Sequence, residues 1–296
     1  MKKILVAATL FFSAGVRAQT LQQWAQTVNW DGISYFTKYI NFNAAHMGPN
    51  ALTVPFLSGG SIDSVTSIGV TGQFHFSKGD NTQNPNLYAN FCLAKNKVSI
   101  DINWVPFEHF TESDTIKKIR HVYYPFYYDK MAKGDVIVNT NINVLNQWRD
   151  KIQLALRIGV RLPSSGHKDV ARARFVDATC YYVDVSMGKP LSHNLKWISM
   201  AGLYVWQQDK DDLRQNDAFL FGSGLQWNKK GWKLETSFAG YLGYIKNSGD
   251  KPILIRAGTE KKIKNSILLF RLQQGIHDFK YTSVETGVKF CFSDKK

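Results

Sequence analysis

The final strand-like segment of the sequence, Tyr281 to Phe292, alternates apolar and polar residues with a strict period of two. One face holds Val284, Thr286, Val288, Phe290 and Phe292, and the other holds Tyr281, Ser283, Glu285, Gly287, Lys289 and Cys291. A period of two is that of a β-strand, in which successive side chains point to opposite faces. One face of this strand therefore needs an apolar surrounding and the other a polar one.

Similar segments recur from Ile68 onwards, and about twelve of them have the length of a strand that crosses a membrane in a barrel. The clearest one places six apolar residues on one face: Ile152, Leu154, Leu156, Ile158, Val160 and Leu162. Its other face carries Lys151, Gln153, Arg157, Gly159 and Arg161. The segment from Leu195 to Val205 is less regular, because Ile198 and Met200 fall on its polar side.

The connections between these segments alternate in length. The short ones are 95–97, 145–150, 189–194, 228–231 and 260–265, and the longer or more polar ones are 78–86, 105–134, 163–179, 207–216, 246–251 and 275–278. Short periplasmic turns that alternate with longer external loops are typical of outer-membrane barrels. Counting along them gives an even number of strands. The first strand then begins, and the last strand ends, on the short-turn side.

The N-terminus has the three parts of an export signal. Lys2 and Lys3 are followed by the apolar stretch from Ile4 to Phe12 and by a small-x-small site that ends at Ala18. After residue 20, no stretch approaches the roughly 18 consecutive apolar residues of a membrane-spanning helix. Because only helices and closed barrels satisfy every backbone group in lipid, an exported chain of this kind is either a secreted β-sandwich or a barrel.

The connection lengths favour the barrel, since a sandwich has no reason to alternate them. We therefore predict an all-β fold: a transmembrane antiparallel up-and-down β-barrel of about twelve strands. It occupies residues 68–292, after a signal peptide (1–18) and an N-terminal segment (19–67), and before a short tail (293–296). The expected location is the outer membrane, with cleavage near Ala18 and with outer-membrane lipids around the barrel.

Two parts of the sequence resemble known outer-membrane barrels. The ending Phe290-Cys291-Phe292 is similar to the signal that barrel assembly machinery recognises, although residues 293–296 extend beyond it. The sequence RIGVRLPSSG from Arg157, followed by YYVDVSMGK from Tyr181, resembles a strand, loop and strand unit of the phenol-degradation-pathway and fatty-acid-transporter superfamily of barrels. This resemblance implies a Gram-negative outer membrane and a porin-like transport activity, without a specific substrate.

Residues 19–67 are the least regular part of the chain, because MGPNAL from Met47 and PFLSGGS from Pro55 break strands and helices. In barrels like the fatty-acid transporters, the corresponding segment folds into the lumen as a hatch, and His46 to Pro55 resembles that arrangement. The alternative is a periplasmic extension, with a small hairpin from Ile33 to Phe42. In both cases we expect this segment at or in the periplasmic mouth.

The polar faces of the predicted strands give the interior a basic character. The inward cations are Lys151, Arg157, Arg161, Lys196, Lys233, Arg256, Arg271 and Lys289, and the inward acids are Asp101, Asp184, Glu235 and Glu285. If these side chains line a water-filled pore, small anionic or amphipathic solutes should pass preferentially. Alternatively, they form ion-pair networks that fill a closed barrel.

Two other functions stay open. His75, Ser77 and the downstream Asn86 are similar to the catalytic element of outer-membrane phospholipases, although Lys78 stands where that family has asparagine and His75 and Ser77 face the lumen. A structural or adhesive barrel is the third possibility. The aromatic cluster from Tyr123 to Tyr128 lies in the long loop 105–134. This loop constricts the pore, binds a partner or ligand outside, or packs on itself and extends neighbouring strands above the membrane.

The net charge and the cysteine spacing exclude several classes of partner. The net charge is +14, but the basic residues are scattered, so no nucleic-acid partner is expected. Cys92, Cys180 and Cys291 have no metal-ligand spacing and form no disulfide framework. The sequence therefore predicts no metal and no cofactor, and it leaves small solutes, lipids and the assembly machinery as partners.

Overall fold

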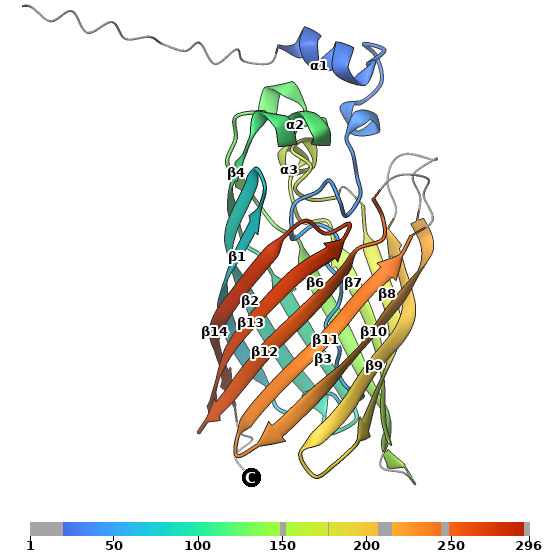
Figure 1. Ribbon diagram of the computed structural model, residues 1–296, viewed down its shortest axis with the longest axis vertical. Helices are drawn as coiled ribbons and strands as arrows, with labels where there is room; N and C mark the ends of the chain where they lie inside the picture. Colours follow the sequence, from blue (N-terminus) through green and yellow to red (C-terminus); the bar gives the residue numbers. More distant parts are fainter. Residues whose placement is uncertain (1–19, 149–151, 177, 207–214, 244–248, 293–296) are drawn as a thin grey trace, which may run out of the picture.

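The computed structural model describes residues 20–148, 152–176, 178–206, 215–243 and 249–292. Within these residues, twelve antiparallel strands close into a barrel (Figure 1). The strands are β1 (Ser67–Ser77), β2 (Asp80–Ala94), β3 (Val98–Trp104), β6 (Val136–Trp148), β7 (Ile152–Leu162), β8 (Cys180–Pro190), β9 (Leu195–Trp206), β10 (Gln215–Lys229), β11 (Trp232–Leu242), β12 (Ile253–Ile263), β13 (Ser266–His277) and β14 (Thr282–Cys291). The predicted fold class is confirmed.

The barrel closes between its first and last strands. β1 pairs with β14 from Ser67 opposite Cys291 to Phe76 opposite Thr282, and its other edge pairs with β2. Every other strand of the wall pairs with the next wall strand in the sequence, which is the up-and-down order. Closure leaves no open edge, so each wall strand has a hydrogen-bonded neighbour on both sides.

The alternation of residues separates the two faces of the wall. On β7, Ile158 and Leu162 are 40% and 45% exposed, whereas Arg157 and Arg161 on the other face are only 8% and 2% exposed. The same apolar exposure continues round the barrel through Phe74, Val183, Leu203, Phe219, Leu234, Ile255 and Phe270. The outer face is thus an apolar band, as a membrane-spanning barrel requires.

Among the described residues, no helix has both the length and the apolar character needed to span a membrane.

The long connections gather at one end of the barrel and the short turns at the other, where the described chain ends (Figure 1). The connection after β3 contains β4 (Glu108–Glu112), α2 (Asp114–Arg120), η2 (Tyr124–Phe126) and β5 (Met131–Ala132), and the connection after β7 contains α3 (His167–Ala171). β4 pairs with the upper end of β2, with Glu112 opposite Asp80. Of the alternatives for this loop, packing on itself and extending the strands above the barrel is therefore the one observed.

The N-terminal part begins at the long-loop end, beside these loops (Figure 1). It forms α1 (Leu21–Val28), which starts with a capping box between Thr20 and Gln23, and then η1 (Phe36–Tyr39). The predicted hairpin from Ile33 to Phe42 is wrong, because residues of this stretch form the short helix η1 instead of strands. The expected position in the periplasmic mouth is wrong for α1 and η1, which lie at the opposite end.

Residues 51–60, which we call the lumen segment, descend through the barrel. Near the upper end of β7, Arg161 hydrogen-bonds the carbonyl of Ala51. Near the lower end of β9, the Nζ of Lys196 donates to the carbonyl of Gly59 over 3.1 Å. Ten residues reach at most about 33–36 Å when extended, enough to cross the roughly 25 Å apolar band of such a barrel. The lumen segment therefore runs most of the length of the barrel.

A hydrophobic core lies inside the barrel, between the wall and the N-terminal chain. The chain contributes Met47, Ala51, Leu52, Val54 and Leu57, and the wall contributes Tyr182, Ile198, Met200, Tyr204, Trp206, Leu220, Tyr241 and Leu254. Ile198 is fully buried, and Met200 is 4% exposed. These two residues break the alternation of β9 because they pack inward on the N-terminal chain instead of facing water.

Candidate functional site

Cationic side chains of the wall hold the lumen segment by its backbone carbonyls. Arg256 donates from Nη1 to the carbonyl of Pro55 over 2.8 Å and from Nη2 to the carbonyl of Val54 over 2.5 Å. Lys196 and Arg161 hold Gly59 and Ala51 in the same way. An irregular segment has carbonyls without strand partners, and a buried carbonyl needs a donor. These basic residues supply the donors.

Phe56 strengthens the contact in the middle of the lumen segment. The guanidinium of Arg256 lies 4.0 Å from the centre of its ring, and that of Arg271 lies 4.8 Å from it. Each distance suits a cation–π contact. Arg256 thus holds three consecutive residues of the segment, two by hydrogen bonds and one by its ring.

Acids pair with Arg161 as well, which lies 3.3 Å from Asp135, and with other cations of the wall. Arg157 on β7 donates to Asp184 on β8 over 2.7 Å. Arg271 on β13 lies 3.1 Å from Glu260 and 3.3 Å from Glu285. Glu260 is not among the predicted inward acids, although it lies four residues after Arg256 on β12 and therefore has the same strand parity. With Glu260 included, the wall from β11 to β14 carries nearly balanced charge.

Three further lysines were predicted to face the lumen. Lys233 lies 3.7 Å from Glu235 and 3.9 Å from Glu260, so it joins the pairs of Arg271. Lys289 stands apart, with its Nζ 4.1 Å above the ring of Tyr88. Lys151 lies outside the described residues.

A polar cavity of about 400 Å³ remains between the lumen segment and the wall. Amide side chains line much of its wall on β2, β3 and β6, namely Asn86, Asn90, Asn103, Asn139 and Asn141. The carboxylate of Asp101 accepts hydrogen bonds of 2.7 Å from Asn139 and from Asn141. This volume is within the range of small-molecule sites. Apart from Asn86, this amide wall was not among the predicted site residues.

The residues of the possible hydrolase do not form a catalytic pair. The Nδ1 of His75 lies 2.7 Å from the hydroxyl of Ser283 on β14, and the described residues contain no hydrogen bond between His75 and Ser77. Asn86 lies opposite Thr71, whereas the residue opposite His75 is Thr82. His75 is on the inner face, where it lines the polar cavity. The geometry therefore gives no support to a lipid hydrolase at this position.

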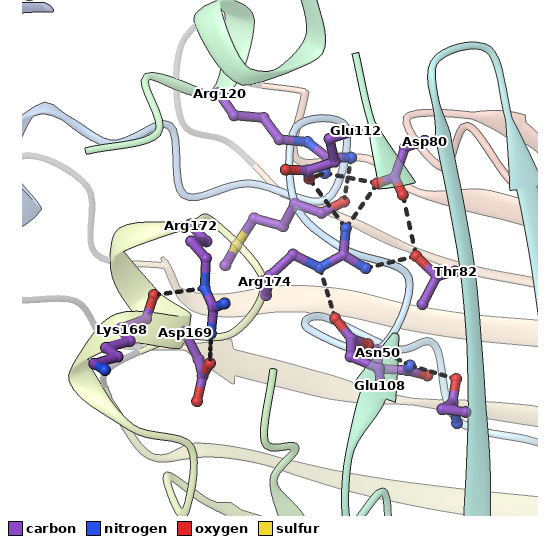
Figure 2. A network of polar contacts seen from close by, with 12 residues as sticks. Asn50, Asp80, Thr82, Glu108, Glu112, Arg120, Lys168, Asp169, Arg172 and Arg174 are labelled. Carbon is purple, nitrogen blue, oxygen red and sulfur yellow. Dashed lines mark hydrogen bonds and ion pairs between the residues drawn. The ribbon is translucent and has the colours of Figure 1, made fainter. Parts of the chain in front are cut away.

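A second group, which we call the outer ion cluster, is a network of polar contacts among the long loops (Figure 2). Its members are Asp80, Glu108, Glu112, Arg120 and Arg174, all buried. Arg174 donates to Glu108 over 2.6 Å and to Asp80 over 2.8 Å. Arg120 lies 2.6 Å from Asp80. The cluster joins β2, β4, α2 and the loop after α3, which are separate in the sequence.

The N-terminal chain contacts this cluster directly. The amide of Asn50 donates to Glu108 over 2.8 Å, and Arg120 donates to the carbonyl of Met47 over 3.3 Å. Complete burial raises the pKa of Glu108 above its usual value, although Arg174 and Asn50 act in the opposite direction. The outer cluster and the lumen segment are therefore one connected structure.

Comparison with known proteins gives a fold. No protein-family model and no curated protein matches the chain. An outer membrane channel from Pseudomonas putida F1 is similar with a TM-score of 0.59 at 10% identity, over 81% of this chain and 100% of that one. The KdgM porin (TM-score 0.46, 10% identity, 76% and 99% covered) and the Pseudomonas putida toluene transporter TodX (0.40, 9%, 85% and 98%) are more distant. This chain therefore has the fold of the outer-membrane β-barrels.

Proposed function

We propose that this protein is an outer-membrane channel for small solutes and that the lumen segment is its gate. The observation that carries the proposal is the set of contacts from Arg161, Lys196 and Arg256 to the backbone carbonyls of residues 51–59. These contacts come from single side chains of the wall and not from a strand ladder, so each can be made or broken without a change in the pairing of the strands. Water or a solute can replace the segment at each of these donors.

The strength of these contacts is suited to a gate. After exchange with water, a hydrogen bond from a charged donor contributes a net of only about 1.5–3 kcal/mol. The barrel wall, by contrast, is held by continuous ladders between twelve strands. The lumen segment can therefore leave its position without opening the wall.

We expect the solutes to be small, anionic and able to form several hydrogen bonds. Arg256 and Lys196 have no carboxylate partner among the described residues, so both are left with free charge when the carbonyls of the segment leave. Charge in a narrow lumen with low-dielectric walls raises the local concentration of anions. The neighbouring amide wall offers both donors and acceptors to hydroxyl groups.

The surface of the barrel supports a place in the outer membrane. The apolar band fits outer-membrane lipids, and we propose that the chain is exported with cleavage near Ala18. The barrel assembly machinery of a Gram-negative cell would then insert it, using the last strand up to Phe292.

Single-channel recording in planar bilayers tests the gate. The purified protein should conduct rarely, whereas a variant without residues 20–60, in which the export signal is joined to Ser61, should show a large and persistent conductance. Heat-dependent migration on a gel would establish that this variant is folded. A folded deletion variant that does not conduct would overturn the proposal.

Two variants that each lose one positive charge distinguish the loss of a contact to the lumen segment from the loss of charge alone. Arg256→Gln removes the donors to Val54 and Pro55, and it should raise the open probability and lower the preference for anions. Lys289→Gln removes one positive charge without a contact to the lumen segment, so it should lower the anion preference alone. Equal open probabilities in the two variants would contradict the assignment of the gate.

A further inference from the structure

The two ends of the barrel differ, and this gives the barrel a direction. Cys291, the last residue of β14, pairs with Ser67, the first residue of β1, at the short-turn end. The turns at Asn96, Lys230 and Lys264 lie at this same end. In outer-membrane barrels the short turns face the periplasm and the longer loops face outwards. The end that carries α2 and α3 is thus the outer end.

The N-terminal helices are attached to the outer end by several contacts. The Nε1 of Trp24 donates to the carbonyl of His121 over 3.1 Å, and its ring lies 4.9 Å from that of Tyr123. Phe36 stacks on the ring of the same tyrosine, with ring centres 4.6 Å apart. The backbone amide of Asn41 donates to the carbonyl of Arg120 over 3.2 Å. These contacts come from backbone groups and aromatic rings, so they fix both the position and the orientation of this region.

Between these helices and β1, the chain passes through the lumen. Gly48 donates to the carbonyl of Ala173 in an outer loop over 3.0 Å. Further along, Gly59 is held by Lys196 near the lower end of β9, and the side chain of Asn90 donates to the carbonyl of Val65 over 2.8 Å. β1 then begins at Ser67 and returns upwards. The chain therefore crosses the barrel once inside it before it forms the wall.

We propose that the region from Thr20 to Asn43 is displayed on the outer surface of the cell. The chain then crosses the membrane an odd number of times, with twelve crossings in the wall and one in the lumen. An up-and-down barrel with an even number of strands has its two ends on one side. The threaded segment moves the N-terminal region to the other side. The barrel thus serves as an anchor that presents its own N-terminal region outside, in one surface with α2 and α3.

Labelling of intact cells with a membrane-impermeant maleimide tests this topology. Ile33 is 92% exposed in the region that we place outside, and Lys264 lies at the exposed tip of a short turn. Each is changed to cysteine, Ile33→Cys or Lys264→Cys, in a full-length chain in which Cys92, Cys180 and Cys291 are replaced by serine. We expect equal labelling of Ile33→Cys before and after permeabilisation, and labelling of Lys264→Cys only after it.

An epitope inserted between Gly32 and Ile33 provides a second measurement in the chain with its natural cysteines. It should bind antibody on intact cells. Access to position 33 only after permeabilisation, in both measurements, would overturn the proposal. Labelling of Lys264→Cys on intact cells would overturn it as well, because the barrel would then have the opposite direction. Both readouts report position and not conductance, so they can fail while the channel proposal stands.

Discussion

Arg174 and Glu108 form an ion pair in complete burial, with 2.6 Å between Nε and Oε1 and no solvent exposure of either side chain. Arg174 follows α3, and Glu108 begins β4, so the pair joins two outer loops (Figure 2). Glu108 also accepts a hydrogen bond from Asn50, which precedes the lumen segment. Closure of the outer end and placement of the N-terminal chain therefore depend on the same carboxylate.

Replacement of Arg174 should loosen the outer end. Arg174→Gln leaves Asp80 and Glu112 with Arg120 as their arginine partner, and among the described residues it leaves Glu108 with the amide of Asn50 alone. Removal of one partner from a buried ion pair costs about 3–5 kcal/mol. We expect rapid trypsin cleavage after Lys117 in folded protein. Asp114→Asn is the control, because the side chain of Asp114 is 56% exposed and its pair with Lys117 contributes at most about 1 kcal/mol. Equal cleavage rates in the two variants would contradict the role of the cluster.

Leucines inside and outside the barrel should respond differently to truncation. Leu52 is 3% exposed in the inner core, and Leu234 is 44% exposed on the outer face. Leu52→Ala removes buried contacts that cost about 2–5 kcal/mol, so hydrogen exchange in residues 51–57 should rise roughly 30-fold or more. Leu234→Ala should leave that exchange unchanged in detergent. An unchanged rate in Leu52→Ala would show that the core does not hold the segment.

A methyl group at Gly60 should push the lumen segment from the wall. Gly60 has a φ of +70°, and a Cβ there would lie 2.2 Å from the carbonyl oxygen of Gln153. Gly32 has a similar φ of +77° but no atom within 4 Å of such a Cβ. Gly60→Ala should therefore raise the open probability in bilayers, whereas Gly32→Ala adds only local backbone strain of about 1 kcal/mol. The same open probability in both variants would argue against close packing at Gly60.

The carboxyl group of Asp31 should titrate at unusually low pH. The hydroxyl of Ser34 and the backbone amides of Ile33 and Ser34 donate to it, and together they lower its pKa from 3.8 to about 2. Because the folded pKa is depressed, this turn gains stability above the unfolded value and loses it as the pH falls towards 2. Carbon NMR of labelled aspartate would give the midpoint, with Asp31→Asn to identify the signal. A midpoint near 3.8 would contradict these hydrogen bonds.

The wall of the barrel was predictable because each strand carries its own signal. The alternation along β7 specifies which residues face outwards, and the structure places Ile158 and Arg157 accordingly. The alternation on β9 is blurred, since Ile198 and Met200 face an inner core that a local pattern cannot reveal. The prediction thus weakened where a second layer of protein replaces water.

The contacts of the candidate site were much less predictable. His75 meets Ser283, which is 208 positions away in the sequence, because β1 and β14 become neighbours only when the barrel closes. Arg256 meets carbonyls that are 201 and 202 positions away. Every residue has a backbone carbonyl, so no sequence motif marks the one that Arg256 selects.

The sequence by itself determined the strands, their inner and outer faces and the alternation of turns and loops, because a period of two is a local property of the chain. Only the tertiary structure decided what the interior contains. It placed Val54 and Pro55 against Arg256, and it carried Trp24 to the end opposite the one expected. The path of an irregular segment depends on donors and apolar surfaces that separate strands bring together when they close.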